Sequence, residues 1–275
     1  MNNFEFLRFV NIGQYLPLDS YLHRLDPRAR ILAYGLIIVA VTFTPRPHGL
    51  VVGLLLMVGL LRLGRIPLHY AFRSVLPPLP FLLILAVMQI FLAVHPADAV
   101  PFMTIGPVSI FSAGLLSAGM LLLRFTVLIL AIGLASFTLS TSEMIHGLEA
   151  LLAPLTRIGI PTHDFVMVVQ VTVRFIPFLA QAAERIAKAQ ASRGAEWGVR
   201  KGNLWQRARQ VAPLMVPLFL TSLRRAETMA LAMDARGYGS PVRRTSLITM
   251  QFLWRDGLVV CLAVLLAAAM LFLGR

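Results

Sequence analysis

Five long apolar runs constrain the fold of this chain more than any other feature. They cover residues 31–44, 49–61, 75–94, 113–137 and 253–273. A helix needs roughly 20 apolar residues to cross a bilayer, and lipid offers no partner to an unpaired backbone group, so such runs fold as helices. Composition agrees, because 58% of the residues are hydrophobic, against roughly 45–50% in soluble domains. The sequence therefore predicts an all-α integral membrane protein with about five transmembrane helices.

The first two runs are shorter than an ordinary span. Pro45 and Pro47 lie between them in "TPRPHG", and proline interrupts helices. The runs could form two tight helices or one re-entrant hairpin. We favour two helices.

The distribution of Lys and Arg predicts the orientation. Twenty-two of the 25 basic residues lie in the N-terminal segment, between the second and third runs, or between the fourth and fifth runs. These three regions alternate onto one side, and cytoplasmic loops carry an excess of Lys and Arg. The N-terminus is therefore expected in the cytoplasm and the C-terminus outside. The first 15 residues lack the pattern of a signal peptide.

The chain is expected to contain four parts. Residues 1–30 form a cytoplasmic segment, 31–137 four transmembrane helices, 138–252 a cytoplasmic-side region of long amphipathic helices, and 253–275 a fifth transmembrane helix. Ser140 and Glu143 have the spacing of a capping box at the start of the third part. A short helix should follow and end at Pro154. Two long helices come next, each interrupted by proline in its first half and amphipathic in its second half.

Both long helices are predicted to end in an arginine followed by a glycine. These ends are Arg193-Gly194 and Arg236-Gly237. Glycine just past a helix end supplies a left-handed cap, and a basic residue there complements the helix dipole. The alternative is that each arginine projects into a partner, since a guanidinium can bind a carboxylate through two hydrogen bonds.

Four stretches carry a resemblance to a known family. They are "SYLHRLDPRARIL", "RFIPFL", "AQASRG" and "PLFLTSLRRAETMALAMDARGYG". In this order they resemble the transmembrane T component, or EcfT family, of energy-coupling factor (ECF) transporters. The resemblance extends from about Tyr21 to the last apolar run. The last stretch is the most specific.

The resemblance implies a non-enzymatic subunit in a prokaryotic plasma membrane. It would link two cytoplasmic ABC-type ATPases to a substrate-binding membrane S component, for uptake of a vitamin or similar micronutrient. In the family, two Ala-Arg-Gly motifs at the ends of coupling helices dock into the ATPases. The matching residues here are Ser192, Arg193, Gly194, Ala235, Arg236 and Gly237. Ser192 replaces the usual alanine, which leaves the packing at that tip in question. The S component would contact the apolar stripe upstream, at Phe219, Leu223, Met229 and Met233.

Several other activities lack a sequence signal. The chain has no G-x-x-x-x-G-K-[ST] for nucleotide phosphates and no G-x-S-x-G. Its six histidines lack ligand spacing, and Cys261 is the one cysteine. We therefore expect no catalytic residues, metal or cofactor. The basic linker near Trp197 and Trp205 favours anionic lipid over nucleic acid as a partner.

The main alternative is a self-contained polytopic secondary transporter. Such a protein would have charged or unwound sites near the bilayer midplane, and Arg124 inside the fourth run is the one candidate. A membrane-embedded enzyme would need clustered His, Asp or Glu within the spans.

Overall fold

The computed structural model describes residues 15–92, 103–105, 108–159, 161–194, 204–239 and 250–273. The described residues form two compact units. One lies within residues 13–158 and 250–275 and is called the membrane unit. The other lies within residues 159–249 and is called the helix-pair unit. The predicted basic linker around Trp197 falls outside the described residues.

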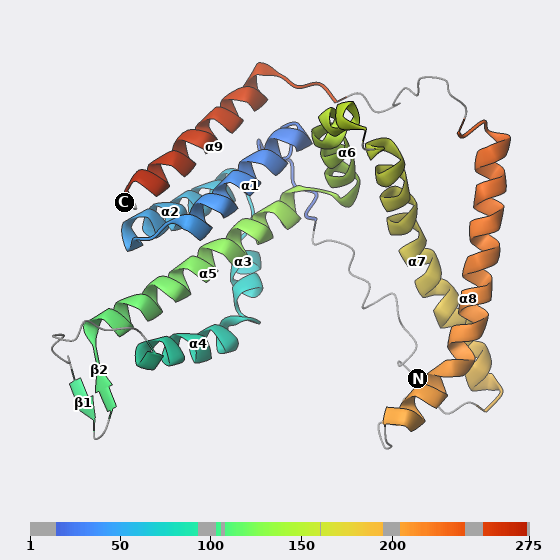
Figure 1. Ribbon diagram of the computed structural model, residues 1–275, viewed down its shortest axis with the longest axis horizontal. Helices are drawn as coiled ribbons and strands as arrows, with labels where there is room; N and C mark the ends of the chain where they lie inside the picture. The colour runs from blue at the N-terminus through green and yellow to red at the C-terminus, as the bar shows by residue number, and fades with distance from the viewer. Residues whose placement is uncertain are drawn as a thin grey trace. The chain divides into compact units, whose positions relative to one another are not determined.

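The membrane unit contains the apolar helices that the sequence predicted and two amphipathic ones. Their bounds are α1 Pro27–Phe43, α2 Pro47–Leu63, α3 Leu68–Val75, α4 Leu79–Leu92, α5 Ser112–Thr138, α6 Thr141–Leu152 and α9 Trp254–Leu273, with a 3-10 turn over Ala153–Ile158. Helix α5 packs against α1, α2, α3 and α4, and α9 covers α1 and α2 (Figure 1). The buried core includes Val41, Leu50, Met57, Val127 and Phe137. The prediction of an all-helical membrane protein is confirmed.

A short antiparallel ribbon precedes α5. Strand β1 covers Met103–Ile105 and β2 covers Val108–Ile110, with Met103 opposite Ile110. The sequence analysis did not predict it. The two strands form three residue pairs, and the other regular elements of the described chain are helical.

The first two apolar runs form two separate helices, as favoured from the sequence. Asp26 caps α1 by accepting a hydrogen bond from the backbone N–H of Arg28 at 2.9 Å, and a proline follows at the first helical position. Pro47 likewise begins α2. Each helix has 17 residues, which gives a length of about 25 Å. This is slightly less than the roughly 30 Å of a bilayer's hydrocarbon core.

The third apolar run, residues 75–94, begins at a break between two helices, where a single continuous helix was expected. Helix α3 ends at Val75, α4 begins at Leu79, and the two are bent by 57°. The break contains Pro77 and Pro78, which cannot donate the backbone hydrogen bonds of a continuous helix. Together the pair is long and apolar enough to count as one bent span.

Three single helices of the described chain are long and apolar enough to cross a membrane: α5, α9 and α7, which covers Thr162–Ser192. Helix α7 meets the criterion in addition to the runs identified from the sequence, where it was assigned to the cytoplasmic-side region. That assignment, and the four-part division of the chain, remain predictions.

The helix-pair unit consists of α7 and α8, which covers Leu204–Ala235. The two helices run antiparallel. The start of α7 meets the end of α8, where the Tyr238 hydroxyl lies 3.5 Å from a carboxylate oxygen of Asp164. Further along, the Arg225 guanidinium lies 4.8 Å from the ring centre of Phe178. Pro177 lies inside α7, and Pro213 and Pro217 lie inside α8, which bends in its first half (Figure 1).

Candidate functional site

The two Arg-Gly ends have the same backbone geometry. Gly194 and Gly237 have φ angles of 86° and 71°, in the left-handed region that glycine enters without strain. Each glycine N–H donates to the carbonyl three residues earlier, Ala191 at 3.0 Å and Asp234 at 2.8 Å. At the second end the Tyr238 N–H also donates to Met233 at 3.0 Å, which completes a Schellman cap. The capping interpretation of both glycines is therefore confirmed.

The capping geometry leaves the arginines exposed. Arg193 and Arg236 are both exposed, and neither guanidinium makes a hydrogen bond or ion pair with another described residue. Ser192 is satisfied locally, because its hydroxyl donates to the Ala189 carbonyl at 2.8 Å. Ala235 is exposed as well. Each tip thus presents a small residue, an unpaired guanidinium and a glycine to the solvent.

The end of α7 and the end of α8 lie at opposite ends of the helix-pair unit (Figure 1), and the two arginines directly follow these ends. Arg236 lies near the start of α7, whereas Arg193 lies at its end. Helix α7 has 31 residues, which corresponds to about 46 Å. One partner groove of ordinary size cannot hold both side chains.

An open groove of about 750 Å³ lies between the first half of α7 and the second half of α8. Its lining is mostly apolar and includes Met229 and Met233 from α8, facing Val171 and Phe175 from α7. The other two residues predicted on this stripe do not line the groove. Phe219 is 65% exposed and Leu223 is 46% exposed. The structure therefore divides the predicted S-component surface into a groove and an exposed apolar patch.

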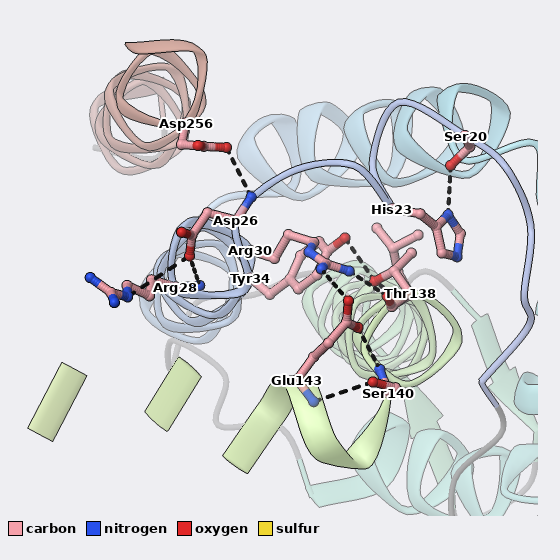
Figure 2. A network of polar contacts seen from close by, with 11 residues as sticks. Ser20, His23, Asp26, Arg28, Arg30, Tyr34, Thr138, Ser140, Glu143 and Asp256 are labelled. Carbon is pink, nitrogen blue, oxygen red and sulfur yellow. Dashed lines mark hydrogen bonds and ion pairs between the residues drawn. The ribbon is translucent and has the colours of Figure 1, made fainter. Parts of the chain in front are cut away.

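A buried polar network joins four elements of the membrane unit (Figure 2). The guanidinium of Arg30, in α1, donates to the Thr138 carbonyl at the end of α5 and to Glu143 in α6 at 3.0 Å. Arg30 is 2% exposed. Tyr34 lies one helical turn further along α1, and its hydroxyl is 3.0 Å from that of Thr138. These contacts fix the α5–α6 junction against α1.

The same network includes the beginning of α9. The backbone N–H of Asp26 donates to a carboxylate oxygen of Asp256 at 3.0 Å, and the other oxygen accepts from the Leu253 N–H at 2.9 Å. Asp256 is 3% exposed. Its carboxylate therefore ties the start of the last helix to the start of the first.

The predicted capping box at α6 is present. Ser140 Oγ accepts from the Glu143 N–H at 3.2 Å, and Glu143 accepts from the Ser140 N–H at 3.0 Å. Burial raises the pKa of Glu143, but the Ser140 N–H and the charge of Arg30 outweigh it and hold the pKa below its ordinary value of 4.5. The carboxylate stays ionised near neutral pH.

Comparison with known proteins identifies the family. Residues 19–247 match the family model described as cobalt transport protein (CbiQ). The energy-coupling factor transporter transmembrane protein EcfT of Brevibacillus brevis is 37% identical over 94% of this chain and 96% of its own length. The protein of the same name from Heliobacterium modesticaldum is 37% identical over 87% of this chain and 88% of its own. The protein of the same name from Acidaminococcus fermentans is 34% identical over 96% of this chain and 97% of its own length.

The chain belongs to the EcfT family. It is thus a multi-pass membrane protein and the transmembrane T component of an ECF transporter, a complex of several subunits. The resemblance inferred from the sequence motifs is confirmed. It covers nearly the whole chain, including both Arg-Gly ends.

Arg124 has a structural role in this EcfT family member. Its guanidinium donates to the carbonyl of Thr44 at 2.6 Å, and Thr44 is the residue that terminates α1. A cation at a helix C-terminus stabilises the free carbonyls there. The residue on which the secondary-transporter alternative depended is therefore engaged in helix packing. The described residues also contain no group of three or more His, Cys, Asp or Glu able to hold a metal ion.

Sequence reasoning missed Arg30 and Asp256 as network residues. Arg30 was counted among the positive charges that orient the chain, yet its side chain is buried. The sequence contained a local signal only for Glu143, the partner of Arg30, because its spacing from Ser140 is that of a capping box. The pairing of Arg30 with a residue 113 positions away depends on how α1 packs against α6.

Proposed function

We propose that this chain couples ATP hydrolysis in two cytoplasmic ABC-type ATPases to a substrate-binding membrane S component. The complex would import a vitamin or a similar micronutrient. The observation that carries the proposal is the pair of exposed arginines, Arg193 and Arg236, which lie at opposite ends of one antiparallel helix pair and have no side-chain partner among the described residues.

The geometry suits two docking partners. A guanidinium offers five donors in a fixed fork and binds carboxylates through two parallel hydrogen bonds. Ala235 at one tip and Ser192 at the other are small enough to allow a close backbone approach. Since the two tips lie at opposite ends of the helix pair, each would occupy the groove of a different ATPase.

The proposed mechanism is a movement of the two helices relative to each other. ATP binding would draw the two ATPases together and move the anchored tips toward one another. The movement would change the separation of α7 and α8 and so the width of the groove that Met229 and Met233 line. The S component would contact this groove and the exposed patch of Phe219 and Leu223. The chain itself would carry out no chemical step.

The proposed orientation places the N-terminus in the cytoplasm of a prokaryotic cell. The distribution of basic residues supports it, since 22 of 25 lie outside the apolar runs in regions assigned to that side. The arginine tips would then face the compartment that contains ATP.

Co-purification from native membranes tests the proposal. The tagged, detergent-solubilised wild type should retain two ATPases and an S component, and the Arg193→Ala/Arg236→Ala double variant should lose the ATPases. Each single variant should retain less ATPase than the wild type. Arg185→Ala on α7 and Arg224→Ala on α8 are matched controls, because both arginines are exposed but lie within the helices.

Loss of the ATPases from the control variants as well would show that general positive charge, and not the two tips, holds the complex. Absence of any ATPase from the wild type in several mild detergents would contradict the proposal.

A further inference from the structure

A polar pocket at the end of α2 has no role in the proposed coupling. It has a volume of about 460 Å³ and is lined by the segment 19–24 and the residues around the α2 terminus. Its charged members are Asp19, Arg24, Arg62 and Arg65. Arg24 binds Asp19 through two nitrogens at 3.0 and 2.9 Å. The aspartate is therefore neutralised, and the guanidinium groups of Arg62 and Arg65 make no hydrogen bond or ion pair with another described residue.

The backbone at this pocket is strained. Among the described residues, Arg65 is the one non-glycine residue with a positive φ, at 53°. It occupies the left-handed position of a Schellman cap, in which the Arg65 N–H donates to Arg62 at 3.1 Å and the Ile66 N–H donates to Leu61 at 3.0 Å. Glycine normally fills this position, as it does after α7 and α8. Here the glycine, Gly64, stands one residue too early, with a φ of −70°, and the arginine takes the unfavourable conformation.

The pocket lies at the end of an apolar stripe. Val51, Leu55 and Val58 are exposed along one face of α2, at the spacing of a helical stripe. Arg62 occupies the next position on this face. It follows Leu55 by seven residues, or about 10 Å along the helix. In a membrane helix, this places Arg62 where the hydrocarbon ends and the headgroups begin.

Two neighbouring side chains also suit a position at the boundary between hydrocarbon and headgroups. Tyr21 is 54% exposed and Leu63 is 60% exposed beside the arginines. Tyrosine is enriched at the membrane–water interface. An exposed leucine would contact acyl chains next to a headgroup, and a soluble ligand would leave it in water.

We propose that this pocket binds the phosphate headgroup of an anionic phospholipid through Arg62 and Arg65. The guanidinium fork matches phosphate oxygens, and two unpaired cations favour a lipid with net negative charge over a zwitterionic one. The strained conformation of Arg65 directs its side chain to the pocket at some cost to stability, as is common at binding sites. The inference does not depend on docking of ATPases.

Native mass spectrometry of the full chain in detergent tests the proposal. Phosphatidylglycerol and phosphatidylcholine of identical acyl chains are titrated against the wild type, Arg62→Ala and Arg65→Gly. The wild type should prefer phosphatidylglycerol, and each variant should bind it about fivefold more weakly, the effect of one basic residue at an anionic surface. Arg46→Ala is the control, because Arg46 is exposed at the opposite end of α2, and it should bind as the wild type does.

Arg65→Gly separates binding from folding. Because glycine relieves the strain at a positive φ, this variant should unfold at a higher temperature than the wild type while binding the lipid more weakly. A stabilised Arg65→Gly variant with unchanged lipid affinity would overturn the proposal, as would equal binding of the two lipids to the wild type. A loss of phosphatidylglycerol affinity in Arg46→Ala would also overturn it, because general positive charge, and not this pocket, would then bind the lipid. Displacement of the lipid by millimolar inorganic phosphate would assign the pocket to a soluble anion instead.

Discussion

Arg30 carries its charge in the interior of the membrane unit, where it contacts two elements more than a hundred residues away in the sequence. A buried ion of this kind is tolerated because its partners are fixed in place. Thr138 supplies a carbonyl and Glu143 a carboxylate that the capping box already orients. The result is a rigid junction between α1, α5 and α6.

We predict that Arg30→Met lowers the thermal unfolding midpoint of the detergent-solubilised protein strongly. Removing one partner of a buried pair costs about 3–5 kcal/mol, and Glu143 is 34% exposed, so we expect the lower end of this range. Arg24→Met is the matched control. Arg24 also pairs with a carboxylate, but the two side chains are 73% and 79% exposed, and exposed pairs contribute little. Equal shifts in the two variants would contradict the structural role of Arg30.

The capping box predicts a dependence of stability on pH. The pKa of Glu143 is lower in the folded protein than its ordinary value of 4.5. A lowered pKa means that the ionised carboxylate stabilises the fold fully above the unfolded-state value, and that this contribution is lost as the pH falls through the folded-state value. The difference in unfolding midpoint between wild type and Glu143→Gln should therefore be constant from pH 7 to 6 and shrink below about pH 4.5. A difference that stays constant down to pH 3 would show that Glu143 does not act through its charge.

Close helix packing in the membrane unit depends on glycine. A Cβ atom at Gly49 of α2 would lie 2.5 Å from Thr44 Cγ2 and 2.7 Å from the Met270 carbonyl oxygen. Gly114 of α5 is equally close to the backbone of α4, at 2.6 Å from the Ile90 oxygen. Since lipid tails are as apolar as side chains, membrane helices associate through such close contacts.

Gly49→Ala should destabilise the membrane unit by about 1–3 kcal/mol, the usual effect of adding an atom to a filled site. Gly59→Ala, on the same helix, should be neutral or stabilising, because nothing lies within 4 Å of a Cβ atom there. Thermal unfolding of the two variants in the same detergent checks the prediction. A milder effect at Gly49 than at Gly59 would show that α2 and α9 do not pack as described.

Most helices were predictable from the sequence, because each apolar run fills a helix and proline or a capping residue bounds it. The runs at residues 31–44 and 49–61 match α1 and α2, and Ser140 marks the start of α6. The third run begins at residue 75 in the sequence, whereas α4 begins only at Leu79. Pro77 and Pro78 separate α3 from α4 near the start of the run, and the amphipathic α3 before them lacks the apolar signal of a span.

The local features of the candidate site could be predicted from the sequence, but its contacts between distant residues could not. Arg193-Gly194 and Arg236-Gly237 could be identified as helix ends because capping depends on adjacent residues. The helical period placed Met229 and Met233 on one face with Phe219 and Leu223, yet α7 reaches only the first two. Periodicity defines a face but not the element that covers it.

At the scale of the whole molecule, we propose that the two arginine tips contact other proteins. The guanidinium groups of buried Arg30 and half-buried Arg124 donate hydrogen bonds to other described residues, whereas Arg193 and Arg236 have no such partner within the described residues. The contrast separates arginines that hold the fold together from the two exposed arginines that we propose as the docking residues.

Site-specific photocrosslinking tests this assignment most directly. A photoreactive amino acid is introduced at position 193 or 236 of the chain within the purified complex, and at positions 185 and 224 as controls on the same helices. Mass spectrometry then identifies the crosslinked residues. We expect crosslinks from 193 and 236 to an ATPase and none from the controls. Crosslinks from 193 and 236 only to lipid or to this chain itself would contradict it.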